Sequence, residues 1–225
     1  MNAARTIVRH ELLNSREHAR LRIRPPQPIG RHFVPIVTSE FPDAAASCPI
    51  LFSKQAINRR LYTGAMFGFK PGENVVNADP CGETFMPLTV ECDGFFILRD
   101  QIYIDRGNSR FSETDGEPLF DDACKPSSRL RKVQRALGRL RAGKQATRQF
   151  TRTLQDLRLI EPIEFSLPFE GSERRRLHGL YRVSIDSLLE VDHAVALRLC
   201  QSGHLQLAHT MSASLSKIGI HRPSR

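Results

Sequence analysis

The stretch from Arg129 to Arg148 combines eight basic side chains with no acidic one. Its cations are Arg129, Arg131, Lys132, Arg135, Arg139, Arg141, Lys144 and Arg148. Its apolar residues Leu130, Val133, Leu137 and Leu140 recur at helical spacing, so we expect a helix with one apolar stripe and a basic outer face. Such a face suits a partner that carries phosphates or carboxylates. We therefore take the eight cations as the candidate partner-binding residues.

Three interpretations of this helix compete. It packs its apolar stripe on the core and shows its charge to water or to residues 33–128, which hold eight basic and fourteen acidic side chains. Alternatively, it binds nucleic acid through phosphates, or it lies on an anionic membrane. The membrane fits less well because the stripe lacks the Trp or Phe that anchors interfacial helices. Nucleic acid fits less well because few aromatic residues lie between the cations for base stacking.

The histidines and serines of the C-terminal third have types that occur in catalytic and metal sites. His204 and His209 are five residues apart and diverge on a helix, whereas a zinc pair sits at a spacing of four. Asp192-His193 lies near several serines, but the chain has no G-x-S-x-G motif. We expect no metal site, no catalytic residue and no cofactor here.

Other polar groups are weaker candidates. Gly64-x-x-x-Gly68 lacks the G-K-[ST] ending of a phosphate-binding loop. The carboxylates of Glu40, Asp105, Asp121 and Asp122 meet at a cation only if the fold gathers them, and their spacing does not require it. The chain is therefore expected to be a binding protein, with an enzyme of unrecognised type as the alternative.

The elements that position these residues change character along the chain. Short apolar runs separated by Gly, Pro, Asn and Asp predict short, mainly antiparallel strands over the N-terminal half. Helical periodicity predicts amphipathic helices in the C-terminal half, and Gly143 and Pro162 are expected to end two of them. Two strands, 163–169 and 177–183, are expected between the helices. One helix is expected to begin at Asp186 and to carry Leu188 to Leu199. The fold class is α+β, as one domain.

The bulk properties fit a protein of the cytoplasm. The 225 residues are 40% hydrophobic and 25% charged, with a net charge of +9. Residues 1–30 are expected to form a basic N-terminal arm and residues 31–225 the α+β domain. We find no signal peptide or membrane span, although leaderless export stays open. The five cysteines have no metal spacing and are interpreted as thiols, with a Cys81–Cys92 bridge as the alternative.

Short motifs are spread over nearly the whole chain. They include Leu13-Asn14-x-x-x-His18, Val34-Pro35-Ile36-Val37-x-x-Glu40-Phe41, Pro49-Ile50-x-Phe52, Gly68-Phe69-x-x-Gly72-Glu73-Asn74, Ile104-Asp105, Gly116-Glu117-Pro118-Leu119-Phe120-Asp121, Leu177-x-Gly179-Leu180-Tyr181-x-Val183, Gly203-x-Leu205, His209 and Ser214-Leu215. In this order they resemble the SapC family of bacterial proteins, which is named after an open reading frame in a surface-layer-protein gene cluster. The chain departs from the family where Glu83-Thr84 replaces a Trp, and where Glu91 to Gly94 replace an arginine-containing block.

The resemblance implies an accessory role in a cell-surface pathway, with protein partners, and implies no known reaction. Eight family residues have no role that the sequence explains: His18, Glu40, Glu73, Asn74, Asp105, Gly179, Tyr181 and His209. The alternative function is nucleic-acid binding through residues 129–148. The sequence leaves the oligomeric state open.

Overall fold

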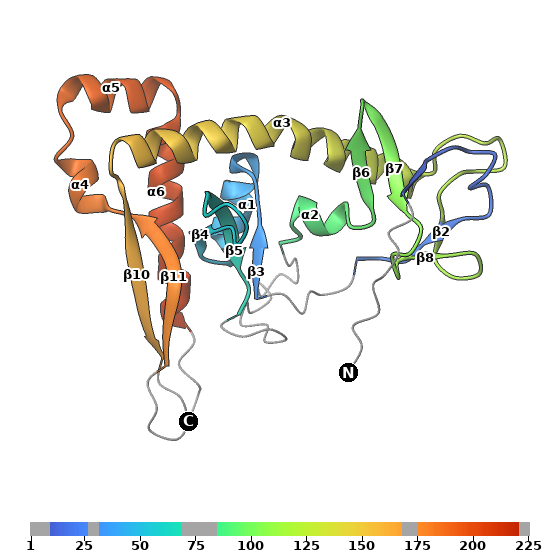
Figure 1. Cartoon of the computed structure of the whole chain (residues 1–225), viewed down its shortest axis with the longest axis horizontal. Helices are drawn as coiled ribbons and strands as arrows, with labels where there is room; N and C mark the ends of the chain where they lie inside the picture. The colour runs from blue at the N-terminus through green and yellow to red at the C-terminus, as the bar shows by residue number, and fades with distance from the viewer. Residues whose placement is uncertain (1–9, 27–31, 69–84, 168–174, 221–225) are drawn as a thin grey trace. The chain divides into compact units, whose positions relative to one another are not determined.

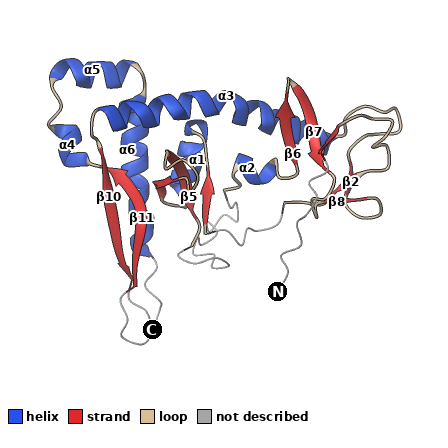
Figure 2. Ribbon diagram, viewed as in Figure 1, coloured by secondary structure: helices blue, strands red, loops and turns tan. Residues whose placement is uncertain are grey.

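The computed structural model describes residues 10–26, 32–68, 85–167 and 175–220 (Figure 1). The α+β fold class is confirmed, with antiparallel sheets in the N-terminal half and helices in the C-terminal half (Figure 2). The chain divides into two compact units. The first unit contains residues 1–28 and 88–141, and the second contains residues 29–87 and 142–225. The expected division into an arm of residues 1–30 and a domain of residues 31–225 stays a prediction.

The first unit contains two small antiparallel sheets and the beginning of a long helix. One sheet has the order β1-β7-β6, formed by His10–Leu12, Gln101–Asp105 and Phe95–Leu98. The other has the order β8-β2-β9, formed by Phe111–Ser112, Arg22–Ile23 and Glu117–Pro118. A short helix α2 spans Leu88–Glu91. The core of this unit includes Leu21, Ile23, Ile104, Leu119 and Leu130, each at most 2% exposed.

The second unit is built on a five-stranded antiparallel sheet of order β10-β11-β4-β5-β3. The strands are Ile160–Leu167, Arg175–Val183, Ile50–Lys54, Leu61–Met66 and Phe33–Pro35. The helices are η1 (Thr38–Glu40), α1 (Phe41–Ser47), α4 (Ile185–Leu189), α5 (His193–Gln201), α6 (His204–Ser214) and η2 (Leu215–Ile220).

Three helices pack on one face of this sheet. Phe41 of α1 and Phe52 of β4 both contact Phe150 of the long helix, with ring centroids 5.8 and 6.2 Å apart, and all three side chains are fully buried. Helix α6 is fixed to the same face because Ser214 Oγ accepts a hydrogen bond from the backbone nitrogen of Ile50 at 2.9 Å. The ring cluster therefore forms the centre of the unit's core.

The long helix α3 spans Ser128–Asp156 without interruption. Ser127 Oγ accepts a hydrogen bond from the backbone nitrogen of Leu130 at 3.2 Å and so caps the start of the helix. The expectation that Gly143 ends the helix is wrong. A β-carbon on Gly143 would lie 2.6 Å from Val37 Cγ2, so the glycine permits a close approach within the second unit.

Two further boundaries differ from expectation. Pro162 lies inside strand β10, opposite Tyr181 of β11, and the preceding helix has already ended at Asp156. The single helix expected from Asp186 is two helices, α4 and α5. Asp192 begins the second one because its Oδ1 accepts a hydrogen bond from the backbone nitrogen of Val195 at 2.8 Å. The two expected strands around residue 170 are confirmed as β10 and β11.

Candidate functional site

Three of the four residues of the apolar stripe of α3 are buried, and Leu140 is half-buried. Leu130 and Val133 are 0% exposed and Leu137 is 4% exposed. Burial of this stripe leaves the remaining surface of the helix to its charged side chains. The stripe therefore has the core-facing role that its spacing predicts.

One of the eight candidate cations belongs to the interior. Arg129 Nη2 lies 2.9 Å from Glu91 Oε1, and both side chains are less than 10% exposed. Neither atom is aligned for a hydrogen bond, so this is a charge pair rather than a directed bond. Lys132 Nζ lies 3.9 Å from the other carboxylate oxygen of Glu91. Arg129 is therefore a structural residue of the first unit.

Arg110 lies in the same buried region and is only 4% exposed. It donates to the carbonyl oxygens of Val90, Glu91 and Asp93 at 3.2, 3.1 and 2.8 Å. Desolvation, and after it the positive charge of Arg129, lowers the pKa of Arg110. Arg110 thus holds the backbone at the end of α2 while Arg129 of α3 pairs with the Glu91 carboxylate, and the two contacts fix α2 and the start of α3 together.

The exposed cations of α3 other than Arg141 fall on two separate rows. Arg131, Arg135 and Arg139 recur every four residues in the first unit and are exposed, and Lys132 lies beside them. Lys144, Arg148 and Arg152 form a second row at the same spacing in the second unit. We call the first set (Arg131, Lys132, Arg135 and Arg139) the basic row.

The basic row has little internal neutralisation. In the described part of the chain, the α3 cations that form ion pairs are Arg129, Lys132 and Arg141. Arg141 pairs with Asp100 at 2.5 Å, while both side chains stay mostly exposed. Arg131 donates to the carbonyl oxygen of Pro126 at 2.5 Å. Arg135 and Arg139 thus present their charge to solvent, which makes this row the candidate contact surface for an anionic partner.

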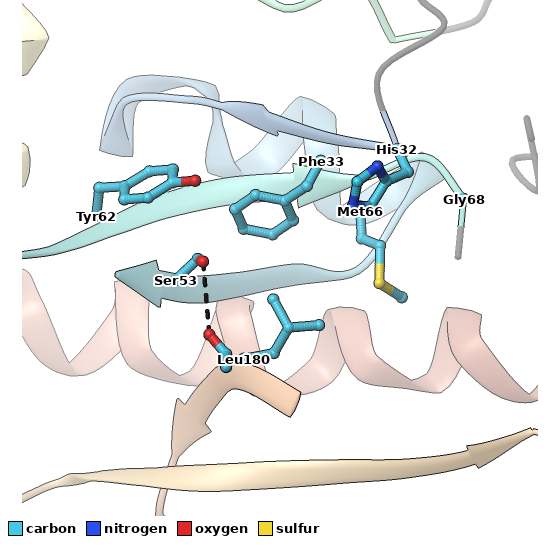
Figure 3. A pocket seen from close by; sticks show the side chains of 8 residues that line it. His32, Phe33, Ser53, Tyr62, Met66, Gly68 and Leu180 are labelled. Carbon is cyan, nitrogen blue, oxygen red and sulfur yellow. Dashed lines mark hydrogen bonds between the residues drawn. The ribbon is translucent and has the colours of Figure 1, made fainter. Parts of the chain in front are cut away.

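A cavity of about 260 Å³ lies on the sheet of the second unit (Figure 3). Its lining residues are His32, Phe33, Ser53, Tyr62, Met66, Gly68, Gly179 and Leu180. Register places Phe33, Ser53, Tyr62, Met66 and Leu180 on one face of the sheet, opposite the face that carries Phe52. Phe33 and Tyr62 meet edge to face at 5.8 Å.

The polar groups of this cavity are not arranged as a nucleophile and its base. The Ser53 hydroxyl is directed at the carbonyl oxygen of Gly179 at 3.5 Å, which is the contact drawn in Figure 3. Among the described residues, no group of three or more His, Cys, Asp and Glu side chains is placed to hold a metal ion. The described helices also include none that is both long and apolar enough to cross a bilayer.

A comparison with protein families complements this geometry. The SapC family model matches residues 13–219, which is nearly the whole chain. The chain belongs to the SapC family. Searches among curated proteins and among solved structures found no significant match. Membership of the SapC family therefore rests on the family model and on the sequence motifs that the chain shares with the family.

Two residues of the SapC motifs, His18 and Glu40, stabilise the local structure. His18 is 3% exposed, with Nε2 3.2 Å from Glu11 Oε2 and Nδ1 3.1 Å from the backbone nitrogen of Asn14. Nδ1 also lies 3.0 Å from the carbonyl oxygen of Asn14, so the ring is held between the Glu11 carboxylate and the backbone of residue 14. Glu40 is 2% exposed, and its Oε2 accepts a hydrogen bond from the backbone nitrogen of Val37 at 2.9 Å, which closes the turn before α1.

The other residues of the SapC motifs are dispersed over the fold. Asp105 lies at the end of β7, where its Oδ1 accepts a hydrogen bond from the backbone nitrogen of Gly107 at 3.1 Å. Gly179 has a φ of +87° in β11, and Tyr181 lies under Lys54, whose Nζ is 4.6 Å from the ring centroid. His209 is exposed on α6. Glu73 and Asn74 lie outside the described residues.

The two C-terminal histidines differ in environment. His204 is 7% exposed and packs edge to face on Phe150 at 5.6 Å. Burial lowers the pKa of His204, and its Nδ1 has no described hydrogen-bond partner. The ring therefore extends the aromatic core, and the cap of α6 is Gly203, with a φ of +73°.

Proposed function

We propose that this chain is a non-enzymatic binding protein that acts in an accessory role in a bacterial cell-surface pathway. Membership of the SapC family supports the assignment to a cell-surface pathway, since the resemblance of its sequence motifs to that family implies such a pathway. The observation that carries the binding role is the basic row on α3. Arg131, Arg135 and Arg139 are exposed at four-residue intervals, and none of them forms an ion pair with a described carboxylate.

The row is suited to a partner with several negative charges in line. Three cations spaced by four residues project from one side of a helix over about 12 Å, at a rise of 1.5 Å per residue. Binding of this kind depends strongly on salt, because each neutralised charge releases a counterion. An acidic protein surface satisfies this requirement, and so does a nucleic acid.

The experiment compares two triple variants with equal changes in charge. The first, Arg131→Gln/Arg135→Gln/Arg139→Gln, removes the three arginines of the basic row and leaves Lys132, which pairs with Glu91. The control, Lys144→Gln/Arg148→Gln/Arg152→Gln, removes the other row of the same helix. We expect the first variant to bind poly-glutamate or a random-sequence duplex more weakly. Its salt dependence should fall by about one unit of slope for each arginine that bound a negative charge of the probe.

The probes separate the two kinds of partner. Binding of poly-glutamate without the duplex favours an acidic protein, and stronger binding of the nucleic acid favours the nucleic-acid alternative. Equal decreases in both triple variants would mean that only net charge matters. Wild-type binding to neither probe, or binding that added salt does not weaken, removes the basis of the proposal.

A further inference from the structure

The three-stranded sheet of the first unit has two faces of opposite character. Its register pairs Phe95 with Ile104 and Phe96 with Tyr103. Because neighbouring residues of a strand point to opposite faces, Phe95 and Ile104 share one face and Phe96 and Tyr103 share the other. Phe95 is 6% exposed and Ile104 is 0% exposed, so theirs is the core face.

Three aromatic rings form a continuous surface on the outer face. Phe96 and Tyr103 are stacked, with ring centroids 5.8 Å apart and planes inclined by 20°. His10 of β1 joins them, with its ring centroid 4.4 Å from that of Phe96. We call these three residues the aromatic ladder. The pairing of Leu12 with Tyr103 places Leu12 on the same face.

This face is open to solvent. Leu12 is 40% exposed and Leu98, which pairs with Gln101 on the same face, is 48% exposed. His10 is exposed, and Phe96 and Tyr103 are half-buried. The surface of a folded protein seldom presents three joined rings flanked by two exposed leucines without a partner. The inward face already forms the core, so the outer rings are open to a ligand.

We propose that the aromatic ladder is a stacking platform for single-stranded nucleic acid. Exposed Phe, Tyr and His rings on a β-sheet are the surface on which unpaired bases stack, whatever their sequence. The polar residues of the same face fit base edges, because an amide such as Gln101 and a carboxylate such as Asp105 hydrogen-bond the amino and ring nitrogens of bases. A duplex cannot use the ladder, because its bases are stacked on one another.

Charge in the first unit favours this ligand. The residues of the unit include 16 Lys and Arg against 11 Asp and Glu. The β6–β7 turn carries the exposed Arg99, and the adjacent Asp100 is neutralised by Arg141 of α3. Phosphates are therefore attracted to the turn end of the ladder. At the other end the carboxylate of Asp105 repels phosphates, which leaves that end to bases.

This inference rests on the proposed anionic partner and names its chemistry. The chain contains no Trp, so Phe96→Trp introduces a single fluorophore into the ladder. We expect oligo-dT and oligo-U of about 12 nucleotides to quench it, because a stacked base contacts the indole. The control is Tyr62→Trp, which lies on the sheet of the second unit and is expected to keep its fluorescence.

Affinity provides a second measurement. Phe96→Leu/Tyr103→Leu keeps apolar volume and removes the π faces, so it should weaken oligo-dT binding by about tenfold or more and leave the salt dependence unchanged. Circular dichroism and the thermal midpoint establish that this variant is folded. If it unfolds, the quenching of Phe96→Trp decides the question.

Each outcome separates the two proposals. If the leucine variant binds oligo-dT more weakly and the triple arginine variant binds it as wild type does, the ladder proposal is supported and the basic-row proposal is contradicted. If only the triple arginine variant binds more weakly, the basic-row proposal is supported and the ladder proposal is overturned. The ladder is also overturned if the Trp is not quenched, if a duplex binds as tightly as the single strand, or if a neutral oligosaccharide such as maltohexaose quenches the Trp instead.

Discussion

Gly143 of helix α3 lies so close to Val37 that a β-carbon on the glycine would be 2.6 Å from Val37 Cγ2 and 2.8 Å from Val37 Cβ. The glycine is buried, and the next turn of the helix reinforces the contact. Thr147 Oγ1 donates to the carbonyl oxygen of Gly143 at 2.7 Å and accepts from the backbone nitrogen of Thr38 at 2.9 Å. The segment before α1 is thereby fixed to the second half of α3.

Gly143→Ala should destabilise the protein although alanine favours helices. The methyl group overlaps a stiff β-branched side chain, and overpacking of this kind costs about 1–3 kcal/mol. The matched control is Gly138→Ala on the same helix, where a β-carbon meets no atom within 4 Å. That change should stabilise by up to about 1 kcal/mol. Urea unfolding measures both, and a stabilised Gly143→Ala protein would contradict the contact.

The pair Glu91–Arg129 gives a prediction about buried charge. Glu91→Leu leaves Arg129 buried without the carboxylate it pairs with, near the positive charge of Arg110, so we expect the free energy of unfolding to fall by about 3–5 kcal/mol. The control is Asp100→Asn, which breaks the exposed pair with Arg141 and should cost less than about 1 kcal/mol. Similar costs for the two changes would show that burial does not strengthen the first pair.

The buried ring of His204 predicts a pH dependence of stability. Its pKa in the folded protein lies below the ordinary 6.5 because burial disfavours the charged ring. The unfolded chain therefore binds the proton more readily, so the full stability is present above about pH 6.5 and declines as the pH falls below it. His204→Leu should reduce the decrease in stability between about pH 7.5 and 5.5.

The exposed His209 provides the comparison for that measurement. His209→Leu, at an exposed position of the same helix, is the control for replacing a histidine by leucine. Denaturant unfolding at both pH values, in one buffer system, gives the result. An equal pH dependence in wild type and His204→Leu would exclude His204 as the titrating group.

The cysteines predict selective labelling. Burial raises the pKa of the Cys48 thiol to about 12, so it stays protonated and covered at about pH 8. Cys124 and Cys200 are exposed thiols. In Cys124→Ser/Cys200→Ser, Cys48 should react with a disulfide reagent only in denaturant, as peptide mapping by mass spectrometry would show. Fast labelling of Cys48 in the native protein would contradict its burial.

The sequence predicted much of the local structure. The spacing of Leu130, Val133 and Leu137 identified the buried stripe of α3 because helical periodicity alone sets which residues share a face. Short apolar runs predicted antiparallel strands in the N-terminal half, and β6 and β7 form such a pair, joined at Arg99 and Asp100, which both take left-handed conformations. The short sequence motifs also indicated the SapC family without any structure.

Contacts between distant segments decided the rest. From sequence alone, a glycine inside a helical pattern predicts the end of the helix. Only tertiary packing shows that Val37 occupies the space in which a side chain at Gly143 would lie. The spacing of the cations did not show that Arg129 pairs with Glu91 inside the core while Arg135 stays exposed. The aromatic ladder joins His10 to Phe96 and Tyr103, and it exists only because strand register places residues more than 80 positions apart on one face.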